Sequence, residues 1–337
     1  MDYQVKENDS FSENISQVYN DTTLSSGAKC LLPYDVGLVM ASINIVMGIC
    51  GTVGNFLVVF AVFFTPALQT ISNKFICSLA LADLLVTMCG QPLLAVLQIG
   101  RTRALCLEEV EFVFRLVGNF SCAVSFLNLC FVSIDRCVAI LKPLQYKTLM
   151  TMGKLKAMLS VVWLLPAVYT VLRLTINKKA TSYFTVLMFA LGYVTILICY
   201  SVIFVTVWRQ AVKRRRLQSI RTQSRSHEGE KRLAKTLAVV IGVFTIAWMP
   251  LFYLRMRAPD KNYGIAYNWA RTVAMSSSAI NPVIYCFRNV QYRSAFRNII
   301  LCVYCSKRKF RQMTSLKNTS SSSRKESSKS SSSVKAV

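Results

Sequence analysis

Seven apolar stretches separated by short polar segments constrain this sequence more than any other feature. They lie at residues 36–64, 75–99, 110–141, 158–172, 184–208, 237–254 and 265–287. A helix that crosses a bilayer needs roughly 20 apolar residues. Most stretches meet or approach that length, and the fourth does so only if residues 153–157 join it. The pattern predicts an all-α membrane protein with seven spanning helices.

The charged residues indicate on which side of the membrane each loop lies. The sequence holds 40 Lys and Arg against 15 Asp and Glu, a net charge of +25. In a soluble protein that excess would suggest a nucleic-acid partner. The basic residues instead gather between apolar stretches, mainly at 213–216, 221–235 and 307–311, which is the positive-inside pattern. We therefore expect no nucleic acid, cytoplasmic basic loops and an extracellular amino terminus.

The amino-terminal tail, residues 1–34, is polar and lacks the apolar core of a cleavable signal peptide. The first span would then serve as its own insertion signal. Asn8, Asn14 and Asn20 each begin an N-glycosylation sequon, and an extracellular tail exposes them to that modification. Chance occurrence in an Asn- and Ser-rich segment is the alternative.

The carboxyl-terminal region divides into two segments. Residues 289–301 place apolar side chains on one face and arginines on another, which predicts a short amphipathic cytoplasmic helix on the inner leaflet. Cys302 and Cys305 follow it as candidates for palmitoylation. Residues 302–337 are rich in Ser and basic, and we expect them to be disordered.

The third apolar stretch ends in an adjacent pair of opposite charges, Asp135 and Arg136, followed by Pro143. Because proline ends or kinks a helix, the pair is expected where lipid gives way to cytosol. Ionisable residues at that depth are costly and usually functional. The pair is therefore the first candidate functional site.

Asp135, Arg136 and Cys137 resemble the Asp-Arg-Tyr triplet at the inner end of the third helix of rhodopsin-like G-protein-coupled receptors. Motifs similar to those of the same family occur in order on the other spans: Gly54-Asn55, Leu79 to Asp83, Trp163, Phe244 to Pro250, and Asn281-Pro282 to Tyr285. Each motif alone is weak. Their order on consecutive spans makes the resemblance specific over about residues 35–302.

The resemblance implies a seven-transmembrane bundle over residues 35–288, the amphipathic segment forming helix 8. It implies a plasma-membrane receptor that converts extracellular ligand binding into activation of heterotrimeric G proteins by outward movement of helix six. Receptor kinases and arrestin would bind the Ser-rich tail. The alternatives are a transporter, for which no inverted repeat is visible, and a non-signalling or decoy receptor. An enzyme is not expected, because His227 is the only histidine and no metal-ligand cluster or nucleophile–base arrangement appears.

Arg136 is the centre of the switch that the resemblance implies. It would bind Asp135 and, across the bundle, Glu230 on helix six, which holds the inner ends of helices three and six together. Ligand binding would free Arg136 for the G protein. The residues that the resemblance assigns to coupling are Asp135, Arg136, Glu230, Leu144, Tyr200 and Tyr285.

Two further groups of residues carry roles in the family. A sodium ion would lie among Asp83, Asn55, Ser125, Ser277 and Asn281, the alternative being a hydrogen-bonded network without an ion. No other cofactor or metal is expected. The activation hinge would comprise Phe244, Trp248, Pro250 and Pro282, because proline removes a main-chain hydrogen bond from a helix.

The sequence departs from the family at three places. Glu111 stands where helix three usually has a disulfide cysteine, the loop 175–182 has no cysteine, and Gly192 replaces the helix-five proline. Cys30 and Cys106 are the only cysteines expected outside the membrane on the oxidising side, so we expect them to be bonded, two free thiols being the alternative. Such departures resemble the melanocortin, lysophospholipid and cannabinoid receptor group.

Candidate ligand-pocket residues lie toward the outer ends of the spans: Glu111, Arg115, Arg255 and Arg271. Arginines there would favour a carboxylate or phosphate on a small acidic or lipid ligand. In the alternative, they pair with neighbouring glutamates. Melanocortin receptors are expected to bind the arginine of their peptide with two acidic residues on helix three. The matching positions here are Glu111 and Arg115, so only one of the two acidic residues is present. Gly118 replaces the aspartate of amine receptors and Met275 the lysine of opsins, which disfavours both ligand classes.

Overall fold

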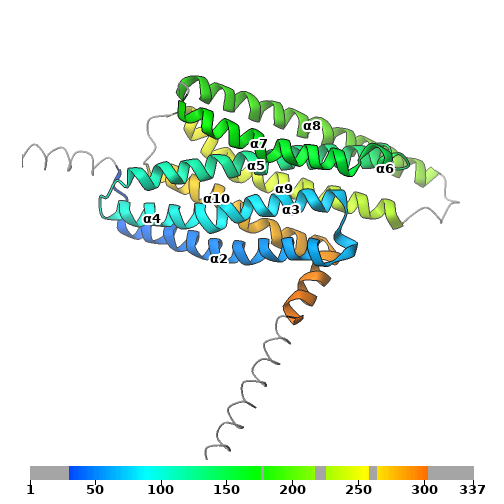
Figure 1. Cartoon of the computed structure of the whole chain (residues 1–337), viewed down its shortest axis with the longest axis horizontal. Helices are drawn as coiled ribbons and strands as arrows, with labels where there is room; N and C mark the ends of the chain where they lie inside the picture. The colour runs from blue at the N-terminus through cyan, green and yellow to red at the C-terminus, as the bar shows by residue number, and fades with distance from the viewer. Residues whose placement is uncertain (1–29, 176–177, 217–224, 258–263, 303–337) are drawn as a thin grey trace, which may run out of the picture.

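The computed structural model describes residues 30–175, 178–216, 225–257 and 264–302. These parts of the chain are helical and contain no strand. The long helices lie side by side in one bundle (Figure 1). They are α2 (Tyr34–Phe64), α3 (Ile71–Leu85), α4 (Gln91–Thr102), α5 (Glu108–Leu141), α7 (Met152–Thr175), α8 (Lys178–Arg216), α9 (Arg225–Arg257) and α10 (Ile265–Arg288).

The predicted spans coincide with these helices. Six helical segments within the described ranges are long and apolar enough to cross a membrane, with α3 and α4 forming one segment, Ile71–Thr102. The more polar α10 lies beside α2 and α9 and completes a seven-helix bundle. The fourth span begins at Met152, so residues 153–157 do extend it. The expected fold class is confirmed.

The second span contains an irregularity that hydropathy did not predict. A π-helical turn, η2 (Val86–Gly90), separates α3 from α4, and Pro92 follows in the first turn of α4. Proline cannot donate a main-chain hydrogen bond to the preceding turn, and π turns often occur near functional sites. The turn separates the part of the span that carries Asp83 from the part that carries Arg101.

The connection after the fourth span differs from the expected loop. Residues 175–182 were predicted to be a short loop, but α7 continues to Thr175 and α8 begins at Lys178. Two residues, 176–177, lie between the helices and outside the described residues. Lys and Ala favour helix, which accounts for the early start of α8 at Lys178.

Gly192, at the place of the usual helix-five proline, allows a close approach of α5 to α8. A Cβ added at Gly192 would overlap the ring of Phe126 on α5. That ring stacks on Phe189 of α8, with centroids 4.5 Å apart, and on Phe244 of α9, at 6.2 Å. The small residue therefore makes room for an aromatic contact among three helices. No sequence pattern pointed to Phe126 or Phe189.

Candidate functional site

The Asp135 carboxylate, near the carboxyl-terminal end of α5, is buried and bonded on both oxygens. Ser72 of α3 donates to Oδ2 at 2.6 Å, and Tyr146 donates to Oδ1 at 2.7 Å. Arg136 donates to Oδ2 from Nε at 3.1 Å and from Nη2 at 2.7 Å. Charge-assisted bonds of this length are the stronger kind. Together they hold the Arg136 side chain against α5 inside the bundle.

Tyr146 and Ser72 also contact Arg136 itself. Tyr146 lies on the short helix α6 (Tyr146–Leu149), and its hydroxyl is 3.3 Å from Arg136 Nη2. Burial raises the pKa of the Tyr146 hydroxyl above its ordinary range, and the Asp135 carboxylate beside it raises that pKa further. The hydroxyl therefore stays protonated and can donate to Asp135. No sequence pattern pointed to Ser72 or Tyr146, because neither residue type is unusual at a helix end.

The other predicted coupling residues are only partly described. Leu144, between α5 and α6, is 98% exposed, as expected of a residue that contacts a partner. Tyr285 of α10 is buried, with its ring 5.7 Å from that of Tyr292, and Tyr200 packs against the core from α8. Glu230 belongs to α9, but its side chain lies outside the described residues. The Arg136–Glu230 pair therefore stays a prediction.

The mid-membrane site brings together part of the predicted set of polar side chains. Asn281 donates to Asp83 Oδ2 at 2.8 Å, and Asn55 donates to the Ser278 carbonyl at 3.2 Å. The Ser277 hydroxyl donates to the Ala274 carbonyl of its own helix, and its place in the network stays a prediction. Ser278, one residue later, was not predicted and also hydrogen-bonds to the Asp83 carboxylate.

Ser125, the remaining member of the predicted sodium site, has a buried hydroxyl with no hydrogen-bond partner in the described part of the chain. An orphaned hydroxyl and the Asp83 carboxylate are oxygen ligands, which hard cations require. The donor set fits the expected sodium ion. The ion itself stays a prediction.

Two of the predicted hinge residues, Phe244 and Trp248, lie next to each other in the core. The rings of Phe244 and Trp248 stack with centroids 5.5 Å apart, and both side chains are buried. Pro250 lies inside α9 and Pro282 inside α10, and both helices continue through their prolines. With Phe126, the stack connects the middle of α5 to the helix-six proline.

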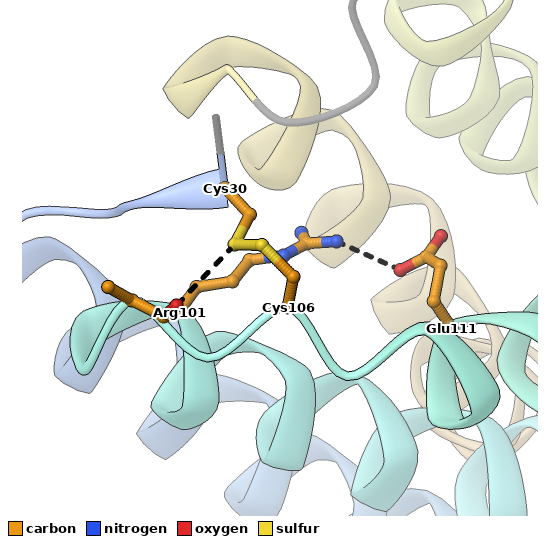
Figure 2. The surroundings of a disulfide bond; sticks show 5 residues. Cys30, Arg101, Cys106 and Glu111 are labelled. Carbon is orange, nitrogen blue, oxygen red and sulfur yellow. Dashed lines mark hydrogen bonds and ion pairs between the residues drawn. A yellow bond between two sulfur atoms is a disulfide. The ribbon is translucent and has the colours of Figure 1, made fainter. Parts of the chain in front are cut away.

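A cluster of charged side chains occupies the outer end of the bundle. Glu111 Oε2 accepts from Arg101 Nη2 of α4 at 2.9 Å, and from both terminal nitrogens of Arg271 of α10 at 3.1 Å. These three side chains are almost fully buried. Arg101 also donates to Asn268 of α10. Figure 2 shows the Arg101 side chain reaching across to Glu111.

The cluster decides between the two alternatives for the outer arginines. Arg271 pairs with Glu111 rather than lining a free cationic cavity, and its guanidinium lies 4.1 Å from the centre of the Phe114 ring. Such a cation–π contact contributes about 0.5–2 kcal/mol. Arg115 is 3.7 Å from Glu111 Oε1, and its side chain is 42% exposed. The Arg255 side chain lies outside the described residues.

Arg101 is the member of this cluster that the sequence did not single out. It ends a span, where arginines often serve only as anchors. The disulfide holds it in place: Cys30 is bonded to Cys106, as expected, with Cα atoms 5.9 Å apart. The Leu32 amide donates to the Arg101 carbonyl at 3.1 Å. Figure 2 shows the disulfide together with Arg101 and Glu111.

The expected modifications remain predictions. Cys302 is exposed at the end of the helix that covers residues 290–302. Cys305 and the sequons at Asn8, Asn14 and Asn20 lie outside the described residues. The Ser-rich tail, with its expected kinase and arrestin partners, lies there too.

Comparison with known proteins agrees with this architecture. Residues 54–285 match the family described as 7 transmembrane receptor (rhodopsin family). Trace amine-associated receptor 5 of Rattus norvegicus is 31% identical over 284 residues, which cover 73% of this chain and 80% of that receptor. The alpha-1A adrenergic receptor of Oryzias latipes is 26% identical over 315 residues, covering 76% and 65%. The crystal structure of squid rhodopsin superposes with a TM-score of 0.69 at 22% identity, covering 81% of this chain and 87% of that one.

These similarities differ in what they establish. Squid rhodopsin shares the fold, and the family comprises receptors rather than enzymes. One of these relatives is named for trace amines, and the expected placement beside the melanocortin, lysophospholipid and cannabinoid group is not confirmed. The family match extends from the first span to the last. This multi-pass membrane protein therefore belongs to the rhodopsin family of seven-transmembrane, G-protein-coupled receptors.

Proposed function

We propose that this receptor lies in the plasma membrane with its amino terminus outside and responds to an extracellular ligand that carries an anionic group. Ligand binding moves the inner end of α9 outward, and Arg136 then leaves its partners and contacts a heterotrimeric G protein. The ligand acts by binding the open state more tightly than the closed one.

The observation that carries this proposal is the arrangement of Arg136. The side chain is buried and bonded to Asp135, Ser72 and Tyr146, so a partner in the cytosol cannot reach it in this state. The Leu144 side chain is almost fully exposed at the same end of the bundle as Arg136. A buried arginine beside an exposed partner-binding residue is the arrangement expected of a switch in its closed state.

The aromatic stack provides the connection from the outer half of the bundle. Trp248 lies two residues before Pro250 and contacts Phe244, which contacts Phe126. A ligand that shifts Trp248 would therefore act on α9 next to its helix-breaking proline. Packed aromatic rings have few alternative arrangements, which suits a two-state change.

Replacing Arg136 with alanine should lower basal G-protein activation at least severalfold relative to wild type at matched surface expression. The guanidinium is the group expected to contact the G protein, and alanine cannot replace it. The measurement is activation of a panel of Gα subunits in cells, with the exposed helix-8 variant Arg293→Ala as the control.

If wild type is silent, Glu230→Ala provides the test, because it removes the expected second partner of Arg136. Its basal signal should exceed that of wild type. The proposal is wrong if Arg136→Ala keeps the full signal, or if both wild type and Glu230→Ala are silent with every Gα subunit.

The ligand class follows from the residues at the outer ends of α5 and α10. One of the named relatives is a trace amine-associated receptor, but this chain has Gly118 where an amine-binding aspartate is expected. Glu111, two turns further out, is already held by Arg101 and Arg271. An amine or the arginine of a peptide would have to displace those guanidinium groups. A small acidic or lipid anion is therefore favoured over a melanocortin-like peptide.

In an agonist screen of organic acids and amines, we expect the active compounds to be acids. The Arg271→Ala variant should lower their potency at least about tenfold, the equivalent of one lost charge-assisted contact of about 1.4 kcal/mol. Arg257→Ala, an exposed arginine at the outer end of α9, serves as the control. An amine agonist with unchanged potency on Arg271→Ala would refute the ligand class.

A further inference from the structure

Two arginines from different helices converge on a single carboxylate oxygen at the outer end of the bundle. Arg101 Nη2 is 2.9 Å from Glu111 Oε2, and the two terminal nitrogens of Arg271 are each 3.1 Å from the same atom. Guanidinium groups match the geometry of a carboxylate, and arginine is the preferred residue for binding one. In this chain, the bound carboxylate belongs to the protein itself.

The contact between Glu111 and Arg271 leaves room for a stronger one. Both terminal nitrogens of Arg271 bind Glu111 Oε2, whereas Glu111 Oε1 lies 3.7 Å from Arg115 Nε. The strong bidentate arrangement places one oxygen on each nitrogen. A carboxylate that enters with both oxygens toward Arg271 can therefore make a better contact than Glu111 does.

Glu111 has a second partner available on its own helix. Arg115 lies one helical turn further along α5, and its side chain is 42% exposed. Residues four apart on a helix face one another, so Glu111 can turn to Arg115 without a change in the backbone. A displaced Glu111 would then keep a paired charge.

We propose that Glu111 is a built-in occupant of an anion site formed by Arg101 and Arg271, and that a ligand carboxylate takes the site by exchange while Glu111 moves to Arg115. The inference rests on the proposed function in one respect, the anionic class of the ligand. Exchange also breaks the Glu111–Arg271 tie between α5 and α10, which joins residues 160 positions apart. Glu111 therefore blocks the anion site until a competing anion displaces it.

Chemical rescue tests the proposal with propionate, which resembles the side chain of Glu. In the purified full-length receptor, Glu111→Ala should lower the thermal midpoint. Millimolar propionate should then raise it by at least about 2 °C, because the free acid fills the vacated site. Propionamide, its uncharged analogue, should have no effect, and wild type should respond less than Glu111→Ala at the same propionate concentration, because in wild type the acid must first displace Glu111.

The double variant Glu111→Ala with Arg271→Ala should lose the rescue, since it lacks one of the two arginines. The inference is overturned if Glu111→Ala ignores propionate, if propionamide acts equally well, or if wild type responds to the same degree. Should Glu111→Ala fail to fold, its surface level in cells grown with propionate becomes the readout. A rise supports the exchange, and no rise overturns it.

The assay separates this inference from the proposed function, because rescue requires no G protein. A receptor that shows rescue but never signals would retain the anion site and lose the proposed function. A receptor that signals in response to organic acids would retain the proposed function. If its Glu111→Ala variant ignored propionate, the anion site would be refuted.

Discussion

Replacing Cys30 and Cys106 together with serine should lower the thermal midpoint of the receptor by about 5–15 °C. The bond joins residues 76 positions apart, and loss of a natural disulfide that closes a long loop typically costs about 2–5 kcal/mol. Circular dichroism or intrinsic fluorescence of the purified receptor measures the midpoint. Cys89→Ser, which removes an exposed free thiol, is the matched control and should leave the midpoint unchanged.

The single variants Cys30→Ser and Cys106→Ser should each have nearly the full effect of the double variant, because either one abolishes the same bond. Additive effects would instead indicate two independent thiols. A double variant that melts with wild type would contradict the structural role of the bond. Since the Leu32 amide binds the Arg101 carbonyl beside the bond, we also expect the variants to weaken binding of any acidic agonist.

The overall fold could be predicted because each spanning helix is encoded by one continuous stretch of sequence. Each span is a continuous apolar run, and lipid satisfies no main-chain polar group, so such a run must become a helix. The short fourth stretch was the test of this reasoning, and α7 extends through residues 153–157 as required. The π-helical turn at Val86–Gly90 was not predictable in this way, because it changes neither length nor hydropathy.

The candidate site was only partly predictable because its partners are distant in sequence. Arg271 and Glu111 were both identified, but their direct pairing was only one of two alternatives, because they are 160 residues apart. Arg101 had the position of an ordinary anchor and became part of the site only through the packing of α4 against α5 and α10.

Converting Asp135 to asparagine should destabilise the closed receptor by about 3–5 kcal/mol, the usual cost of leaving a buried charge without its partner. The buried carboxylate accepts from Arg136, Ser72 and Tyr146, and asparagine supplies no charge to offset the guanidinium. Ser72→Ala and Tyr146→Phe each remove a hydroxyl that bonds to both Asp135 and Arg136, and each should cost about 2 kcal/mol. The thermal midpoints of the purified variants measure this ranking.

Basal signalling provides the second readout of the same variants. Each 1.4 kcal/mol lost from the closed state alone raises the ratio of open to closed receptor about tenfold, so Asp135→Asn should give the highest basal activity of the three. Equal midpoints for all three variants would show that the carboxylate charge contributes nothing to holding Arg136. A low midpoint without increased basal activity would show that Asp135 stabilises both states equally, and hence that the pair with Arg136 supports the fold rather than the switch.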